Sequence, residues 1–213
     1  MTVNREDYLK TIYELGGEKN KIGTKDIAVV LKVSLPSVSE MIKKLVDEGY
    51  IEYVLYKGVI LTPSGLAMAK KIKKRHLLWE VFLVEKLGFD WEDVHIEAEM
   101  LEHMTSPKLE GKLEKYLNYP EVCPHGTPIE DHSYIFNYIS LDRIQEGESV
   151  VIKRLEDEKI ILKYSKQEGL NIGDTIKVHS KDQKRIAIIQ DSGIFVEIKN
   201  ELAKKIYVNK EML

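Results

Sequence analysis

The sequence has few of the features that mark secreted, membrane-embedded or disulfide-stabilised proteins. It contains one cysteine, Cys123, which excludes a disulfide within the chain and fits a reducing compartment. No apolar run approaches the roughly 18 residues that cross a bilayer, and the opening residues lack the apolar core of a signal peptide. We therefore expect a cytoplasmic protein that does not act at a membrane.

Motifs of common hydrolases are also missing. The sequence has no His-Glu-x-x-His pair, no glycine-rich phosphate loop and no motif around a nucleophilic serine or cysteine. We expect no enzymatic activity and no organic small-molecule substrate. A metalloenzyme with a nucleic-acid-binding domain is the alternative, and hydrolysis of an ester or phosphodiester that depends on Glu102 would favour it.

Charge is distributed unevenly over the 213 residues. Residues 1–75 hold 14 Lys and Arg against 9 Asp and Glu, whereas residues 76–140 hold 4 against 13 and residues 141–213 hold 14 against 13. A basic first third suits nucleic acid, and an acidic middle suits cations. Solvated charge on helix faces is the plain alternative for any single block.

The first third has the pattern of a winged helix-turn-helix domain, which we assign to residues 1–72. A short helix, a tight turn and an amphipathic helix, followed by a hairpin, is the order of such a domain. Thr24 is the expected N-cap of the short helix, and Gly49 is the expected stop of the amphipathic one. The expected elements are helices at 4–16, 25–31, 36–48 and 63–86 and a hairpin of 51–56 with 59–62.

The amphipathic helix of this motif would enter the major groove of double-stranded DNA. Its start offers serine hydroxyls, a proline and a glutamate to base edges, and the lysines around it would contact phosphates, although solvent exposure is the alternative for each lysine. Two such domains in a two-fold dimer predict a palindromic operator with half-sites one or more helical turns apart. The candidate DNA-contacting residues are Lys25, Ser34, Pro36, Ser37, Ser39, Glu40, Lys43, Lys44 and Lys57.

The rest of the chain changes from helical to strand-like periodicity. Residues 76–117 are expected to form helices whose apolar surface exceeds what they bury, which predicts a homodimer unless a further domain covers it. Residues 118–133 are expected to form a loop. We assign residues 73–140 to a central helical domain and 141–213 to a small β-barrel. The expected strands include 150–152, 160–162, 175–178, 185–189 and 194–198.

Potential metal ligands gather on one helical face in the acidic middle of the chain. At about 100° per residue, His95, Glu99, Glu102 and His103 fall within about 100° of arc. His76 and Glu80 form a second pair with i,i+4 spacing. Carboxylates and imidazoles on one face repel each other or lose solvation unless a cation lies among them, and a divalent metal is the usual cation.

The whole chain resembles the metal-dependent repressors typified by the diphtheria toxin repressor and the manganese transport regulators. The resemblance implies a multidomain α+β protein with a winged helix-turn-helix, a central helical metal-binding and dimerisation domain, and a small C-terminal β-barrel like FeoA or SH3 domains. It also implies repression of metal-uptake genes with the metal as co-repressor. The matching segments are Glu6-Asp-Tyr-Leu-Lys-Thr-Ile-Tyr-Glu-Leu15, Pro36-Ser-Val-Ser-Glu40, Leu61-Thr-Pro-Ser-Gly65, Arg75-His76-x3-Glu80 and His95-x3-Glu99-x2-Glu102-His103.

The resemblance carries over two metal sites residue by residue. Iron-sensing members have methionine and cysteine where this chain has Asp7 and Glu99, and these hard carboxylates favour Mn²⁺, with Fe²⁺ as the alternative. Zn²⁺, Cd²⁺ or Co²⁺ would substitute in vitro. Lys10 stands where manganese regulators often have another carboxylate, which argues against a two-metal cluster. The implied primary site is Asp7, Glu99, Glu102 and His103, and the implied ancillary site is His76, Glu80 and His95.

Three further residues are candidate ligands. Cys123 and His125 lie in the expected loop and would complete the ancillary site or form another site, with a buried thiol and a surface imidazole as the alternative. The barrel supplies an acidic ligand in some relatives, and Glu158 is the best match, with a solvated turn as the alternative. The implied switch recruits Asp7 to the other primary ligands and so fixes the N-terminal helix. A purely structural metal is the alternative, and operator binding by metal-free protein would distinguish the two.

Overall fold

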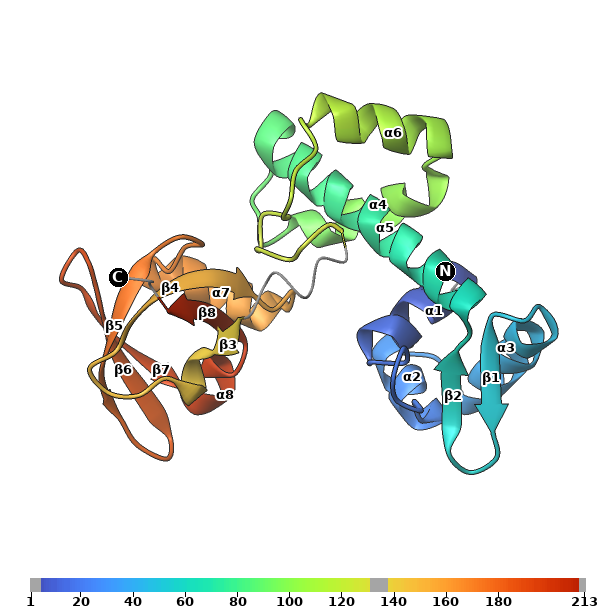
Figure 1. The fold of residues 1–213 in the computed structure, drawn as a ribbon, viewed down its shortest axis with the longest axis horizontal. Helices are drawn as coiled ribbons and strands as arrows, with labels where there is room; N and C mark the ends of the chain where they lie inside the picture. Colours follow the sequence, from blue (N-terminus) through green and yellow to red (C-terminus); the bar gives the residue numbers. More distant parts are fainter. Residues whose placement is uncertain (1–4, 131–137, 211–213) are drawn as a thin grey trace. The chain divides into compact units, whose positions relative to one another are not determined.

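The computed structural model describes residues 5–130 and 138–210. It divides into two compact units, which we describe separately (Figure 1). The first unit comprises Met1–His76 with Leu101–Thr105, and the second comprises Leu77–Met100 with Ser106–Leu213. Among the described residues, no helix combines the length and apolar character that a membrane span requires.

The first unit confirms the winged helix-turn-helix. Alternating apolar positions of its three short helices and the hairpin bury one core, in which Leu9, Ile12, Ile27 and Leu45 are almost fully enclosed. The two hairpin strands pair antiparallel, with Ile51 opposite Leu61. The elements are α1 (Arg5–Glu14), α2 (Thr24–Leu31), α3 (Leu35–Asp47), β1 (Ile51–Val54), β2 (Gly58–Leu61) and the first part of α4 (Pro63–Leu87).

The start of α3 shows why the chain turns into this helix. Ser34 is its N-cap, and the Ser34 hydroxyl accepts a hydrogen bond from the backbone N–H of Ser37 at 3.3 Å. Pro36 lies in the first turn, where its missing N–H costs nothing. The expected N-cap of α2 was wrong, because Thr24 is already the first helical residue and Gly23 precedes it without a side-chain cap.

Removing the α3 cap should weaken the winged helix. We expect Ser34→Ala to lower the free energy of unfolding by about 1 kcal/mol, because the N–H of Ser37 then loses its acceptor within the chain. Urea titration monitored by circular dichroism measures this loss. Ser39→Ala, a change at an exposed position inside the helix, is the control and should leave the stability nearly unchanged.

The wing differs in detail from the sequence expectation of a turn around Lys57-Gly58. Gly58 is already part of β2 and pairs with Val54, so the turn residues come earlier and Tyr56 adopts a positive φ of 61°. Gly58 also lies against the backbone of Ile22, which forms an isolated antiparallel bridge with Val59. A Cβ added to Gly58 would lie 2.1 Å from the carbonyl oxygen of Ile22, so this close approach requires glycine.

The helical part of the second unit is built on the end of α4. It continues with α5 (Val94–Met104), of which the last residues belong to the first unit, and with α6 (Pro107–Tyr116). The helix breaks lie around Gly88, after the end of α4, and at Pro107, where α6 begins. Their shared core contains Leu77, Leu78, Val81, Leu113, Leu117, Cys123 and Ile129.

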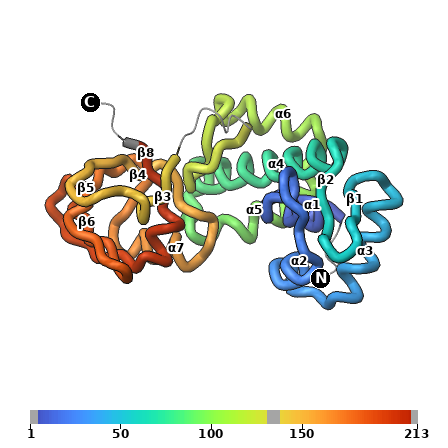
Figure 2. The backbone as a smooth tube through the Cα atoms, turned by 60° about the horizontal axis from the view of Figure 1, so that its bottom comes forward, coloured from blue at the N-terminus to red at the C-terminus, as the bar shows by residue number. Residues whose placement is uncertain are grey.

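The rest of the second unit is a sheet of six antiparallel strands in the order β3-β8-β4-β5-β6-β7. Figures 1 and 2 show these strands curled around one interior. Alternate residues of the long strands point inward, including Val150, Ile152, Ile176 and Ile186, as a small barrel-like domain requires. The elements are β3 (Ile139–Ser140), β4 (Ser149–Leu155), α7 (Lys159–Glu168), β5 (Thr175–Lys181), β6 (Arg185–Gln190), β7 (Phe195–Lys199), α8 (Asn200–Ala203) and β8 (Ile206–Lys210), with a 3₁₀ turn at Leu141–Arg143.

One predicted strand was wrong. The run Ile160-Ile-Leu belongs to α7, which ends at Gly169 in the left-handed conformation. The buried positions of α7 are Ile161, Leu162 and Ser165, a helical spacing that the short apolar run concealed. The predicted strand set also lacked β3 and β8, although β8 lies between β3 and β4.

Candidate metal centre

The first cluster of ligand side chains lies wholly within the first unit. The ligand atoms of Asp7, Glu102 and His103 all lie within 4.8 Å of one another. His103 Nε2 is 2.8 Å from Asp7 Oδ1 and 3.5 Å from Glu102 Oε1. Asp7 is in the first turn of α1, whereas the other two are near the end of α5. The cluster therefore joins two helices that are far apart in the sequence.

Glu102 is fully buried because it continues the buried stripe of α5. Val94 and Ala98 precede it at intervals of four residues. Its carboxylate is held on both oxygens: Lys10 Nζ donates to Oε1 at 2.6 Å, and His76 Nδ1 lies 2.5 Å from Oε2. Burial would raise the pKa of Glu102, but the hydrogen bond to His76 and the charge of Lys10 lower it below its ordinary value. Glu102 is thus ionised and ready to act as a ligand.

The predicted primary ligand Glu99 lies outside this group. It is exposed and belongs to the residues of the second unit. Glu6 was not among the predicted site residues, although its Oε2 lies 2.6 Å from His103 Nδ1. The role of Glu99 as a ligand stays a prediction.

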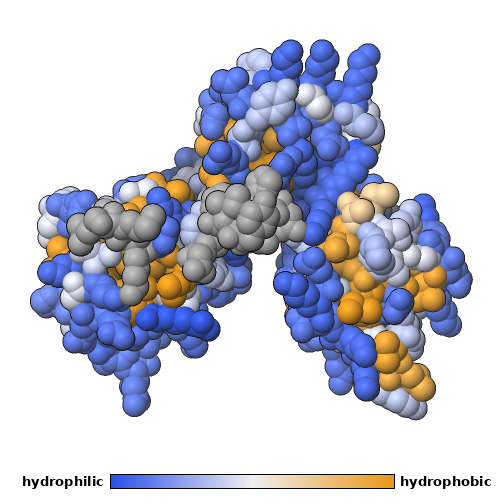
Figure 3. Space-filling view, viewed as in Figure 1, coloured by the Kyte–Doolittle hydropathy of each residue, from blue (hydrophilic) through white to orange (hydrophobic). Residues whose placement is uncertain are grey.

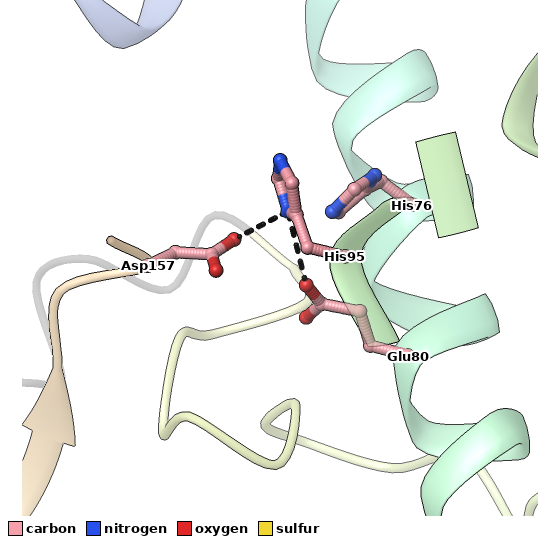
Figure 4. A group of neighbouring side chains, drawn as sticks. All are labelled: His76, Glu80, His95 and Asp157. Carbon is pink, nitrogen blue, oxygen red and sulfur yellow. Dashed lines mark ion pairs between the residues drawn. The ribbon is translucent and has the colours of Figure 1, made fainter. Parts of the chain in front are cut away.

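The second cluster lies within the second unit and centres on Glu80, which is fully buried in α4. His95 Nδ1 is 3.6 Å from Glu80 Oε1 and 3.0 Å from Asp157 Oδ2 (Figure 4). His125 Nδ1 is 3.4 Å from Glu80 Oε2 and 3.8 Å from Cys123 Sγ. Helix, loop and barrel-like domain therefore each contribute a ligand to one place.

The imidazole of His125 is oriented by the helical domain. Its Nε2 donates a hydrogen bond to the carbonyl oxygen of Trp91 at 2.6 Å, and the Trp91 ring stacks on it with centroids 5.7 Å apart. When the ring is neutral, its proton stays on Nε2 and the lone pair of Nδ1 faces Glu80 and Cys123. A backbone acceptor that fixes the tautomer in this way is typical of metal-binding histidines.

The loop that carries Cys123 and His125 is seated on β4. The carbonyl oxygen of His125 accepts a hydrogen bond from the N–H of Leu155 at 2.9 Å. Gly126 has a φ of +79°, and a Cβ there would lie 2.0 Å from the carbonyl oxygen of Lys153. This backbone contact places the loop beside Asp157, which follows β4 in the chain.

Carboxylates strongly perturb the basic and thiol groups of the second cluster. Burial would lower the pKa of His95, but hydrogen bonds and charge from Asp157 and Glu80 raise it to about 10. Burial acts in the same direction on His125, whereas Cys123 and Glu80 raise its pKa to about 11. Burial and the charge of Glu80 raise the pKa of Cys123. In the metal-free protein, protons on His95 and His125 therefore supply the positive charge of this cluster, and a bound metal would take their place.

The structure groups the three residues of the implied ancillary set, His76, Glu80 and His95, with Asp157 (Figure 4). It brings Glu80 and His95 together with the two loop candidates, Cys123 and His125. From the acidic stretch 156–158 it places Asp157, and not Glu158, in the cluster; the Glu158 carboxylate pairs with Lys205. His76 lies one turn before Glu80 on α4, and its Nδ1 contacts Glu102 of the first cluster.

The donor chemistry of both clusters fits a divalent cation. The first offers carboxylate oxygens and an imidazole nitrogen, which suit Mn²⁺ or Fe²⁺. The second adds the Cys123 thiol, a softer ligand that suits later transition metals. The fully buried Glu80 carboxylate of the second cluster needs positive charge nearby, whereas Lys10 already supplies it to the buried Glu102 of the first. The residues present thus fit bound metal at two places.

The nine residues proposed to contact DNA are all exposed on the winged helix. Among them, Lys44 Nζ pairs with Glu40 Oε1 at 2.8 Å on the outer face of α3. Hydrophobic residues interrupt the hydrophilic surface of this part (Figure 3). The exposed large apolar residues around α3 and the wing are Leu35, Val46, Tyr53, Leu55 and Tyr56.

Three family profiles match consecutive parts of the chain. Residues 1–59 match the N-terminal DNA-binding domain of iron-dependent repressors. Residues 62–131 match the metal-binding and dimerisation domain of the same repressors, and residues 139–210 match the FeoA domain. This order agrees with the predicted fold class.

Individual relatives point the same way. The iron-dependent repressor IdeR of Mycobacterium leprae is 38% identical over 124 residues, which are 58% of this chain and only 54%, about half, of that protein. The structure of the manganese regulator SloR is 38% identical with a TM-score of 0.82, over 99% of this chain and all of that one. A manganese-dependent transcriptional repressor in complex with manganese is 31% identical with a TM-score of 0.88, over 97% of this chain and all of that one. These relatives are transcriptional regulators and not enzymes. The chain therefore belongs to the iron-dependent repressor family of metal-dependent transcriptional regulators.

Proposed function

We propose that this protein represses transcription of metal-uptake genes when a divalent metal binds the first cluster, and that Mn²⁺ is the preferred metal. The observation that carries the proposal is the meeting of Asp7 on α1 with Glu102 and His103 on α5. A ligand on the first helix of the winged domain makes the position of that domain dependent on the cluster. Helix α1 therefore couples metal binding at the first cluster to DNA binding by the winged domain.

The chain's own residues supply the switch. A bound cation supplies the positive charge that the clustered carboxylates share. With that charge present, Asp7 holds α1 to α5, and α1 packs on α2 and the wing through the core of the winged helix. Without it, α1 keeps the Lys10–Glu102 ion pair but lacks the metal-mediated link from Asp7 to α5, so α1 is less firmly held. The metal binds more tightly to the DNA-competent arrangement than to the one with α1 loosely held, and so it shifts the population toward the DNA-competent arrangement.

The choice of manganese rests on the donors of the first cluster. Asp7, Glu102 and His103 offer hard oxygen and nitrogen ligands, and Glu99 would add another carboxylate. This set lacks the sulfur that would strengthen binding of later metals. Fe²⁺ has similar ligand preferences and is the alternative.

The active species would be a homodimer on a palindromic operator in the cytoplasm, where the chromosome is accessible. The matched dimerisation domain and the exposed apolar side chains of the second unit support the dimer. These side chains are Leu87, Phe89, Ile96, Met100, Leu109 and Tyr116. We also propose functional domains at 1–72, 73–140 and 141–213.

Binding to genomic DNA fragments at fixed salt tests the function. We expect tight binding with Mn²⁺, or with Fe²⁺ under anaerobic conditions, and weak binding by metal-free protein. Asp7→Ala should remove the metal dependence by at least about tenfold in affinity while leaving the fold intact, because α1 loses its ligand. Equal binding of the wild type with and without metal would make the clusters structural and contradict the switch.

A further inference from the structure

Two consecutive residues of α1 hold the imidazole of His103 at its two edges. Glu6 Oε2 lies 2.6 Å from Nδ1, and Asp7 Oδ1 lies 2.8 Å from Nε2. All three side chains are partly buried within the first unit, at 33%, 16% and 18% exposure. The ring therefore has one defined orientation.

The two ring nitrogens point away from each other, so one metal ion can accept a lone pair from only one of them. Asp7 and Glu102 both lie on the Nε2 side, at 2.8 and 3.5 Å. The metal would therefore be bound through Nε2. Nδ1 must then carry the proton, and Glu6 is placed to accept its hydrogen bond.

We propose that Glu6 is a positioning residue of the first cluster, and this rests on the proposed metal binding there. Its carboxylate accepts a hydrogen bond from the Nδ1–H of His103 and so fixes the tautomer in which Nε2 carries no proton. The same hydrogen bond makes Nε2 a stronger electron-pair donor to the metal. A carboxylate behind a histidine ligand has this effect in metal sites generally. Glu6 itself is outside the group whose ligand atoms converge.

The second cluster uses the same arrangement with a different acceptor. There the Trp91 carbonyl holds the Nε2–H of His125 and leaves Nδ1 to face the ligands. In the first cluster the acceptor comes from α1, the helix that also carries Asp7. Movement of α1 would remove a ligand and the orienting carboxylate together. Metal affinity and the seating of α1 are thereby coupled more tightly than through Asp7 alone.

Mn²⁺ titration of three variants tests the proposal, in a Cys123→Ser/His125→Gln background that disables the second cluster. We expect Glu6→Ala to weaken Mn²⁺ binding by about 10- to 100-fold. Glu6→Gln should lose less, because its amide oxygen still accepts the Nδ1–H. Glu18→Ala is the control, since Glu18 is exposed and pairs with Lys70. Equal affinity of Glu6→Ala and its parent would overturn the proposal.

Nitrogen-15 spectra of the Zn²⁺-loaded protein give a second readout, with the His103 signals assigned by comparison with His103→Gln. We expect the metal on Nε2 and a slowly exchanging proton on Nδ1, and faster exchange of that proton in Glu6→Ala. Metal on Nδ1 in the otherwise unchanged protein would also overturn the proposal, whether or not a variant folds. If the parent protein binds no Mn²⁺ at all, the proposed function fails instead.

Discussion

Glu102→Ala should destabilise the metal-free protein by about 3–5 kcal/mol, the usual cost of removing one partner of a buried ion pair. The Glu102 side chain is fully buried, and that of Lys10 is only 7% exposed. Without the carboxylate, the Lys10 ammonium is left in a site that water hardly reaches, and His76 loses its partner at 2.5 Å. Urea unfolding in the presence of a chelator measures the change.

A double-mutant cycle separates this electrostatic effect from lost packing. The charge-free pair Lys10→Met/Glu102→Leu should be clearly more stable than the sum of the single changes, by on the order of 1–3 kcal/mol, since neighbouring residues couple. Additive effects of the two substitutions would show that the Lys10–Glu102 ion pair contributes little. Glu18→Ala, at an exposed pair, should change the stability by less than about 1 kcal/mol.

Metal binding at the second cluster should depend steeply on pH. In the metal-free protein His95 has a pKa of about 10 and His125 of about 11, so both carry protons at neutral pH. A nitrogen ligand must lose its proton before it binds metal. Each displaced proton makes the apparent affinity rise about tenfold per pH unit, so the two histidines together contribute about 100-fold per unit, and a bound Cys123 thiolate adds a further factor of about ten.

Calorimetric titration with Cd²⁺ between pH 6 and 8, in buffers of different ionisation enthalpy, counts the released protons. Asp7→Ala is the suitable background because it weakens the first cluster. His125→Gln should release one proton fewer than this parent. Binding without proton release would contradict the assignment of His95 and His125 as ligands.

The metal-free protein should respond to pH in the opposite sense. Because folding raises the pKa of His95 and His125, their stabilising contribution is complete below their ordinary pKa of 6.5 and is lost as pH rises through about 10 to 11. Metal therefore matters most for the second cluster in alkaline solution, where protons no longer neutralise Glu80 and Asp157.

Local sequence patterns were sufficient for the helices of the winged domain, whereas the assignment of most ligand candidates to metal sites came from the family resemblance. The Ser34 cap, Pro36 and Gly49 act on their own neighbours, so the limits of α3 are encoded within the segment. The spacing of Glu102 and His103 likewise follows from one helix. Periodicity failed for α7, where three consecutive apolar residues fit a strand as well as a helix.

Contacts between distant segments could not be derived from spacing. Helical periodicity put Glu99 on the same face as His103, but Glu99 is exposed and its carboxylate is not among the ligand atoms that converge with Asp7. Asp157 and Glu158 are neighbours with the same charge, and only the path of the chain after β4 brings the first to His95. The approach of α1 to α5 likewise sets Glu6 and Lys10 against His103 and Glu102. The residue types and their order thus indicated a metal-responsive DNA-binding protein. Which side chains meet depends on packing between elements, because ligand geometry rests on distances that the order of residues does not contain.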